Sequence, residues 1–241
     1  MKKPTGYVIY RGPSLIDGNP IVAIAIVGKS KNAKTGNMVQ VYILADNGLS
    51  PLESARRGYD YSICGDCKHR RYNKKGSCYV NLGQGPNNIM KGLLRNIYPH
   101  DLQAAKMACK DRIIRIGAYG DGAAIPLYVW QELLEYAAGH TGYTHQWQND
   151  EKREYMKFLM ASVDNNAEWI QAKHKGFRTF RVRNESQSLN KGEFICPASK
   201  EKNITHCVSC QACNGGINSN KGNPAIIVHG VLKKRFTLTQ V

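Results

Sequence analysis

The chain has 241 residues, of which 34 are Lys or Arg and 18 are Asp or Glu, so its formal net charge is +16. A hydrophobic fraction of 42% with 22% charged residues excludes wholesale disorder and is enough to build a sizeable core. No apolar run approaches the ~20 residues that a membrane-spanning helix needs. We therefore expect a globular, cytoplasmic protein with no membrane partner.

The first part of the chain predicts a β-meander. Residues 7–10, 21–27 and 38–44 are rich in β-branched and aromatic residues, and Gly, Pro and Asn separate them as turns. Pro51 is expected to begin a short helix that ends at Gly58.

Eight cysteines give the strongest signal in the sequence, and seven of them fall into two sets. The first set is Cys64, Cys67 and Cys78, and the second set is Cys196, Cys207, Cys210 and Cys213. A C-x2-C pair places two thiolates where they can converge on one metal ion, and cytoplasmic thiols stay reduced, so metal binding is favoured over disulfides. Cys109 lies on an apolar helix face and is expected in the core.

The second cysteine set supplies four thiolates, enough to complete a tetrahedral zinc shell or to hold a [4Fe–4S] cluster. Its spacing echoes that of bacterial ferredoxins, but zinc is the commoner ion in a lone four-cysteine staple. The sequence favours zinc here and leaves iron–sulfur as the alternative.

The first cysteine set supplies only three thiolates. Either His69 completes a Cys3His zinc site, or the fourth position stays open, as a catalytic metal or an iron–sulfur cluster requires. A structural alternative is that Cys64 and Cys67 staple the basic loop at residues 68–75, which with Tyr72 suits phosphate contact and base stacking.

Helices and strands alternate in the rest of the chain. Helices are predicted to start at Pro86 and Asp101, to run from Pro126 to Gly139, and to end at Gly176. Strands are predicted at residues 113–118, 143–147, 158–163, 177–182 and 225–231. This pattern predicts right-handed crossovers and a parallel sheet. We expect an α/β fold in which residues 61–241 form a complete or partial (β/α) barrel with metal-stapled loops, and residues 1–60 form its antiparallel N-terminal extension.

In such folds the functional site lies beyond the carboxyl ends of the strands. Three residues there, Asp121, Asp164 and His145, are candidates for acid–base or nucleophilic catalysis. The candidates for substrate binding are Tyr119, Trp147, Ser162, Arg181 and Arg183.

Structural alternatives exist for most of these residues. Asp164 could cap the following helix, Asp121 could form a turn between two glycines, and His145 could be a core histidine. Arg181 and Arg183 share one face of a strand, and because two buried guanidinium groups need an anion, we predict that they hold a phosphate. The net charge likewise favours a nucleic acid as partner, with DNA favoured over RNA.

Five stretches resemble a family of tailed-phage proteins with two cysteine clusters. They are residues 62–81, 115–126, 141–147, 159–164 and 196–213. The family has no settled activity, so the resemblance implies only a phage or prophage setting and hence the cytoplasm of a bacterial host cell.

Two barrel families are similar in outline. The tRNA-guanine transglycosylases and their phage relatives combine two catalytic aspartates with a C-terminal zinc staple, which implies those roles for Asp121, Asp164 and the second cysteine set. Their glycine-rich substrate loop and Cys/His zinc pattern are absent here. Radical SAM enzymes place a three-cysteine, four-iron cluster before a glycine–acid stretch, which implies that role for the first cysteine set and residues 117–121, although their C-x3-C-x2-C spacing is absent.

The sequence thus predicts, first, a transferase that modifies or exchanges a base in nucleic acid and carries a structural metal. Asp121 and Asp164 would act as nucleophile and general base, with His145 assisting and Trp147 or Tyr119 stacking on the extruded base. The alternatives are a non-catalytic, zinc-stapled DNA- or RNA-binding protein and an iron–sulfur enzyme.

Overall fold

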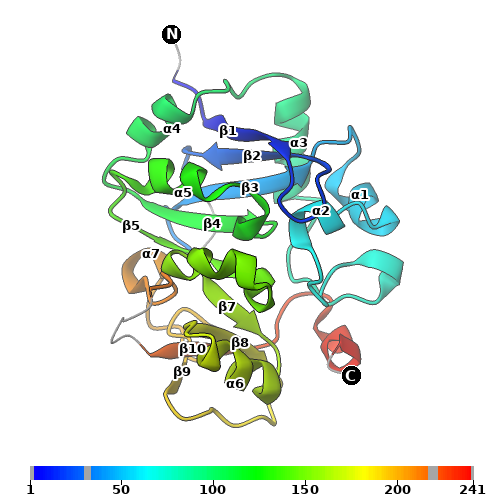
Figure 1. The fold of residues 1–241 in the computed structure, drawn as a ribbon, viewed down its shortest axis with the longest axis vertical. Coiled ribbons are helices and arrows are strands. Elements are labelled where there is room, and N and C mark those ends of the chain that lie inside the picture. The colour runs from blue at the N-terminus through cyan, green and yellow to red at the C-terminus, as the bar shows by residue number, and fades with distance from the viewer. Residues whose placement is uncertain (1–2, 30–33, 217–221, 240–241) are drawn as a thin grey trace.

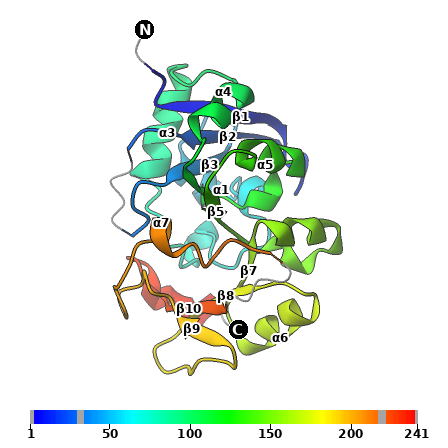
Figure 2. The ribbon, with the colours of Figure 1, turned by 90° about the vertical axis from the view of Figure 1, so that its left-hand side faces the viewer.

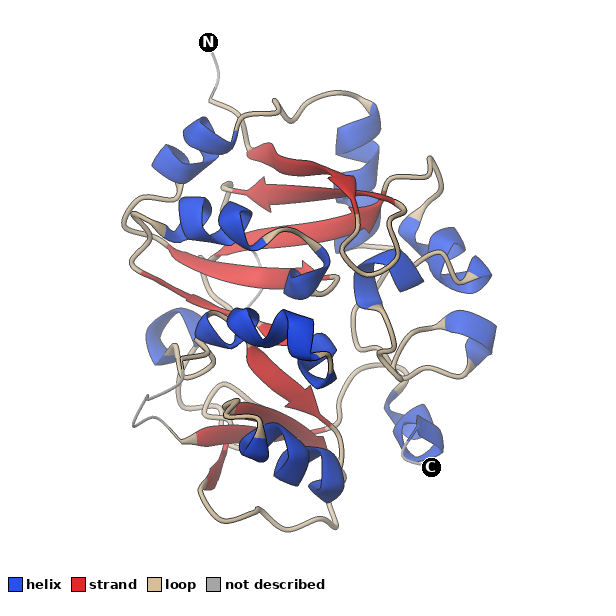
Figure 3. Cartoon of the chain, viewed as in Figure 1, coloured by secondary structure: helices blue, strands red, loops and turns tan. Residues whose placement is uncertain are grey.

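A computed structural model describes residues 3–29, 34–216 and 222–239. Its strands are β1 (Gly6–Pro13), β2 (Pro20–Ile26), β3 (Val39–Ala45), β4 (Ile113–Tyr119), β5 (Gly139–Thr141), β6 (Tyr143–Thr144), β7 (Met160–Val163), β8 (Thr179–Arg183), β9 (Glu193–Ile195) and β10 (Asn223–Ile227). They form two five-stranded sheets, ordered β1-β2-β3-β4-β5 and β6-β7-β8-β10-β9, which lie one above the other in Figure 1 and Figure 3.

The first sheet combines an antiparallel and a parallel part. β1, β2 and β3 pair antiparallel, whereas β3, β4 and β5 pair in parallel. The apolar run of β2 is buried from Ile21 to Ala25, which explains why it reads as a continuous hydrophobic stretch rather than an alternating one. The second sheet is parallel in every recorded pairing.

One short segment passes from the first sheet to the second. β5 pairs with β4, β6 pairs with β7, and only Gly142 stands between them. A Cβ at Gly142 would come within 2.5 Å of Leu159 and 2.9 Å of Ile116, so this crossing requires glycine. β1 and β9 are the two ends of the strand order, and no pairing between them is found in the described residues, so these strands do not close into a barrel.

The helices are α1 (Pro51–Arg57), α2 (Tyr61–Cys64), α3 (Gly85–Leu94), α4 (Leu102–Ala108), α5 (Leu127–Leu134), α6 (Asn166–His174) and α7 (Cys207–Cys210). α4 packs on β1 and α5, α6 packs on β7 and β8, and α1 and α3 pack on β3. Figure 2 shows α5 and α6 on the same side of the strands. In the described ranges, none of the helices has the length and apolarity needed to cross a bilayer.

Most predicted elements are confirmed, including the N-terminal meander and the parallel α/β pattern. Asp101 caps α4 by accepting a hydrogen bond from the amide of Ala104. Some predictions were wrong in extent. α5 ends at Leu134, because Gly139 already belongs to β5, and the strand at 143–147 stops at Thr144, where a 3₁₀ turn begins. The strand predicted at 225–231 is β10, which ends at Ile227. β3 pairs with β4, so the two segments predicted as extension and barrel share one sheet.

Candidate functional site

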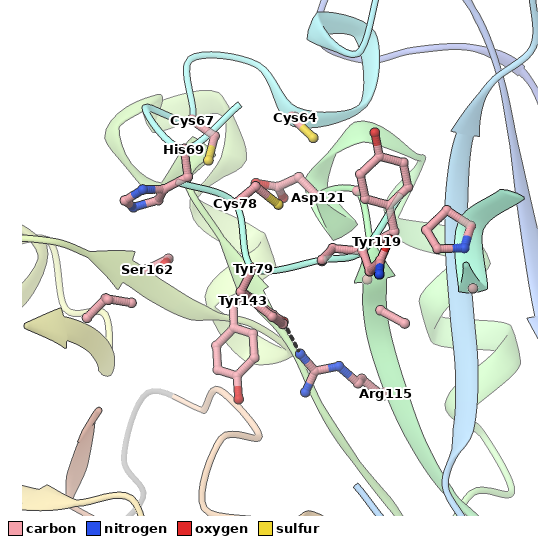
Figure 4. A pocket seen from close by; sticks show the side chains of 18 of the residues that line it. Cys64, Cys67, His69, Cys78, Tyr79, Arg115, Tyr119, Asp121, Tyr143 and Ser162 are labelled. Atoms are coloured by element: carbon pink, nitrogen blue, oxygen red, sulfur yellow. Dashed lines mark hydrogen bonds between the residues drawn. The ribbon is translucent and has the colours of Figure 1, made fainter. Parts of the chain in front are cut away.

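A cavity of about 410 Å³ lies where the two sheets meet the segment that carries the first cysteine set. Strands β3, β4, β6, β7, β8 and β10 each contribute to its wall. In Figure 1, the arrows of β4 and β7 point toward the side on which α2 and the C-terminal segment lie. Figure 4 shows the side chains that face this cavity.

All three cysteines of the first set line the cavity. Cys64 ends α2, and the amide of Cys67 donates a hydrogen bond to the carbonyl of Cys64, which makes the tight turn of the C-x2-C pair. Cys78 returns beside this turn, because its amide donates to the carbonyl of His69. Burial, with the nearby acidic and thiol groups, raises the pKa of the Cys64 and Cys67 thiols well above the usual value. These thiols therefore stay protonated at neutral pH unless a cation stabilises the thiolate form.

The cysteine segment is held together by hydrogen bonds within it and to the residues just before α2. The Arg70 guanidinium donates to Asp60 at 2.6 Å and to the carbonyl of Gly58, and Arg71 donates to the carbonyls of Cys78 and Val80. The segment is thus held in place by contacts that do not use the sulfur atoms.

His69 has both ring nitrogens engaged. Its Nδ1 lies 2.7 Å from Ser77 Oγ, its Nε2 lies 2.9 Å from Asp164 Oδ1, and the ring stacks on Phe236. A metal ligand needs a ring nitrogen with an available lone pair, so His69 can ligate a metal only by giving up one of these contacts. This disfavours His69 as the fourth ligand beside the three thiols.

The ring of His145 lies near both Cys67 and His69. Its Nε2 is 3.7 Å from Cys67 Sγ, and burial lowers its pKa, which favours the neutral imidazole. Ligand atoms of His69, His145 and Asp164 all lie within 4.8 Å of one another. In the described part of the chain this is the one group of three side chains found close enough together to hold a metal ion.

Asp164 does not cap the helix that follows it. The side chain of Asn165 caps α6 by accepting from the amide of Glu168, and Asp164 faces the His69 ring instead. Burial alone would raise the pKa of Asp164, but the contact with His69 and the positive charges of His69, His145 and Lys68 together leave the pKa lowered. The two residues are 95 positions apart in the chain.

Asp121 has a structural position. One carboxylate oxygen accepts from the amide of Ala123 at 2.9 Å, and the other accepts from the amide of His145 at 2.7 Å. Its own amide donates to the carbonyl of Ile63, next to the first cysteine. Asp121 lines the cavity, yet its carboxylate serves to join β4, β6 and α2.

Among the predicted substrate-binding residues, Tyr119 and Ser162 line the cavity, whereas Trp147 belongs to the core. Trp147 donates from Nε1 to the carbonyl of Ser162 at 2.9 Å. The Tyr119 hydroxyl is buried and has no hydrogen-bond partner among the described residues, so it is a polar group available to a ligand.

Arg181 and Arg183 do not appear among the described residues that line the cavity. Arg181 pairs with Glu193 at 2.6 Å, and Arg183 pairs with Glu201 and donates to the carbonyls of Asn184 and Gln187. The anion that their burial requires is supplied by the chain itself, so the reason for predicting a phosphate at this place is removed.

The second cysteine set lies beside the large cavity, and Lys34 and Tyr143 line both spaces. Cys196, Cys207, Cys210 and Cys213 line a separate space of about 10 Å³. The amide of Cys207 donates to the carbonyl of Lys34, and the amide of Val208 donates to the carbonyl of Thr35. The set therefore joins the segment before β3 to the second sheet. Cys109 is buried in the core, as predicted.

Two cavity residues were missed at the sequence level, Arg115 and Tyr79. Arg115 is the one charged residue of β4, and a charge inside a buried strand was the available signal. Its Nη2 donates to the Tyr79 hydroxyl at 2.8 Å, and its guanidinium lies over the Tyr143 ring.

Comparisons with protein-family models, curated proteins and solved structures give no match for this chain.

Proposed function

We propose that this chain is an iron–sulfur enzyme in which Cys64, Cys67 and Cys78 hold a [4Fe–4S] cluster at the wall of the large cavity. The observation that carries the proposal is that three thiols from one short segment face the same 410 Å³ cavity beside the carboxyl ends of parallel strands. Sites of α/β enzymes gather at these strand ends.

The donor set fits a cluster better than a single zinc ion. Structural zinc takes four protein ligands, whereas the first set supplies three thiols. A cluster spreads its cysteine ligands over separate iron atoms, and iron–sulfur clusters bind thiolates. The engaged ring of His69 also leaves the fourth position to the cavity rather than to the protein.

When bound, such a cluster supplies one-electron and radical chemistry to a substrate in the cavity. The chain's own residues would bind and orient that substrate. The Tyr119 hydroxyl, which has no hydrogen-bond partner among the described residues, would bind a polar group of the substrate. His145 would present a neutral imidazole. The rings of Phe180 and Phe236 would form an apolar part of the cavity wall.

We assign the second cysteine set to a structural zinc ion. The 10 Å³ space that its members line suits one ion and not a cube of four irons and four sulfurs. Zinc binding would draw the four sulfurs together, so that ligation contributes to folding stability.

Base exchange through two aspartates has less support. Each oxygen of Asp121 accepts a backbone hydrogen bond, so the carboxylate is fixed in a structural role and its charge is stabilised, which lowers its nucleophilicity. Asp164 is held against His69, 1% exposed.

The cluster assignment is tested by comparing cysteine variants after anaerobic purification. Cys67→Ser should lose the absorbance near ~400 nm that sulfur-to-iron charge transfer produces. Cys109→Ser is the matched control, because this cysteine lies in the core outside both sets, and it should keep the absorbance per folded chain. A colourless wild-type protein, or full colour in Cys67→Ser, would overturn the proposal.

A further inference from the structure

The cavity has a cationic end that the thiols do not occupy. In Figure 4, Arg115 lies on the side away from Cys64 and Cys67, next to Tyr79 and Tyr143. Arg115 is 8% exposed. It donates a hydrogen bond to the Tyr79 hydroxyl, and its Cζ lies 5.4 Å from the centre of the Tyr143 ring. Both tyrosines are uncharged at neutral pH.

The other buried arginines have more complete partners than Arg115. Arg181 and Arg183 each form an ion pair with a carboxylate. Arg178 has no carboxylate partner in these contacts, but it donates to four amide oxygens of the chain. No Asp or Glu of the described ranges, which contain every acidic residue of the sequence, is within ion-pair distance of Arg115. Since guanidinium stays protonated and burying an unpaired charge is costly, the site is incomplete without an anion.

Other cations act at the same end of the cavity. His229 lines it beside Tyr79, with 5.1 Å between ring centroids. Burial lowers the pKa of His229, and so do the positive charges of Lys34, Lys200 and Arg115. Lys34 also lines the cavity. Positive charges from three side chains act on this end of the cavity, and such a field suits a dianion better than a monoanion.

We propose that Arg115 and Tyr79 bind a phosphate group of the substrate, with Lys34 adding to the field. Arg115 offers guanidinium N–H donors to the phosphate oxygens. The Tyr79 hydroxyl accepts from Arg115, so its own proton is available to the phosphate. This inference deepens the proposed function, since it names the class of substrate that the same cavity takes: a phosphate ester whose remainder extends toward the three thiols.

The probe for this site is phenyl phosphate, with benzoate as the carboxylate of matching ring size, titrated by calorimetry at low ionic strength. We expect phenyl phosphate to bind one per chain and more tightly than benzoate. Arg115→Gln should weaken it at least about tenfold, as loss of a charge-assisted hydrogen bond predicts. Arg95→Gln is the control, because this arginine is exposed outside the cavity, and it should change the affinity less than twofold.

Tyr79→Phe tests the same site if Arg115→Gln does not fold. Tyr79 is 47% exposed and the substitution keeps its ring, so this variant is expected to fold. It should weaken phenyl phosphate several-fold and leave the melting temperature unchanged. Unchanged affinity in a folded Arg115→Gln, unchanged affinity in Tyr79→Phe, or benzoate binding as tightly as phenyl phosphate would each overturn the proposal. An iron assay of the same samples reports on the cluster separately, so one assignment can fail while the other stands.

Discussion

At the scale of single residues, Asp121 has a structural role, because its carboxylate accepts two backbone hydrogen bonds. Asp121→Ala leaves the amides of Ala123 and His145 without their acceptor in a buried place. An unsatisfied buried donor costs about 1–3 kcal/mol, so the free energy of unfolding should fall by ~2–4 kcal/mol. Asp121→Asn keeps one acceptor oxygen and should lose less. Urea unfolding measures both, with Glu154→Ala on the exposed surface as the control.

Unchanged stability of Asp121→Ala, together with lost activity on a substrate once one is known, would contradict this role. That result would restore the prediction that Asp121 is a catalytic carboxylate.

The buried ion pair between Arg181 and Glu193 stabilises the second sheet. The side chains are 3% and 0% exposed, and the pair joins β8 to the start of β9. Glu193→Gln removes the charge that compensates a buried guanidinium, and breaking such a pair costs about 3–5 kcal/mol. Thermal or urea unfolding should show this loss. Glu135→Gln, which breaks an exposed pair with Lys106, should leave stability nearly unchanged. Equal effects of the two variants would show that Arg181 does not depend on Glu193.

At the scale of elements, the geometry of the cysteine segment depends on its arginine contacts. Arg70 joins residues on both sides of the C-x2-C turn through Asp60 and the carbonyls of Gly58 and Gly65. Arg70→Leu should therefore lower the metal content per chain although every cysteine is kept. Lys75→Ala, an exposed change in the same segment, should leave it unchanged. Elemental analysis checks both variants, and full metal content in Arg70→Leu would mean that the cysteines alone set the geometry.

The elements themselves were largely predictable because their signals are local. The apolar runs of β2 and β7, Pro51 at the start of α1 and Asp101 before α4 each depend on a few neighbouring residues. β5 and β9 were missed because three-residue strands carry no periodicity, and their existence depends on a partner strand distant in the chain.

The candidate site was less predictable, because its contacts join distant parts of the sequence. The sequence predicted the first cysteine set as a metal site and His145 as a member of a separate site at the strand ends, and the cavity contains both. It could not show that Asp164 meets His69, that Glu193 and Glu201 neutralise the two arginines of β8, or that Arg115 lacks such a partner. These facts depend on side-chain positions that no local pattern encodes.

At the scale of the whole molecule, the net charge of +16 predicts attraction to polyanions. If the phosphate-bearing substrate belongs to a nucleic acid, binding to an oligonucleotide should weaken steeply with salt. For six or more phosphate contacts the affinity should fall about a thousandfold or more between 50 and 200 mM salt. Fluorescence anisotropy across a salt series measures this slope. A flat response, or no binding at low salt, would limit the substrate to a small phosphate ester.

The central claim is that the first cysteine set holds an iron–sulfur cluster and the second set holds zinc. The most direct test is the iron, acid-labile sulfide and zinc content of the anaerobically purified wild-type protein. We predict about four iron atoms, about four sulfides and one zinc ion per chain. Two zinc ions per chain with no iron or sulfide would contradict the claim.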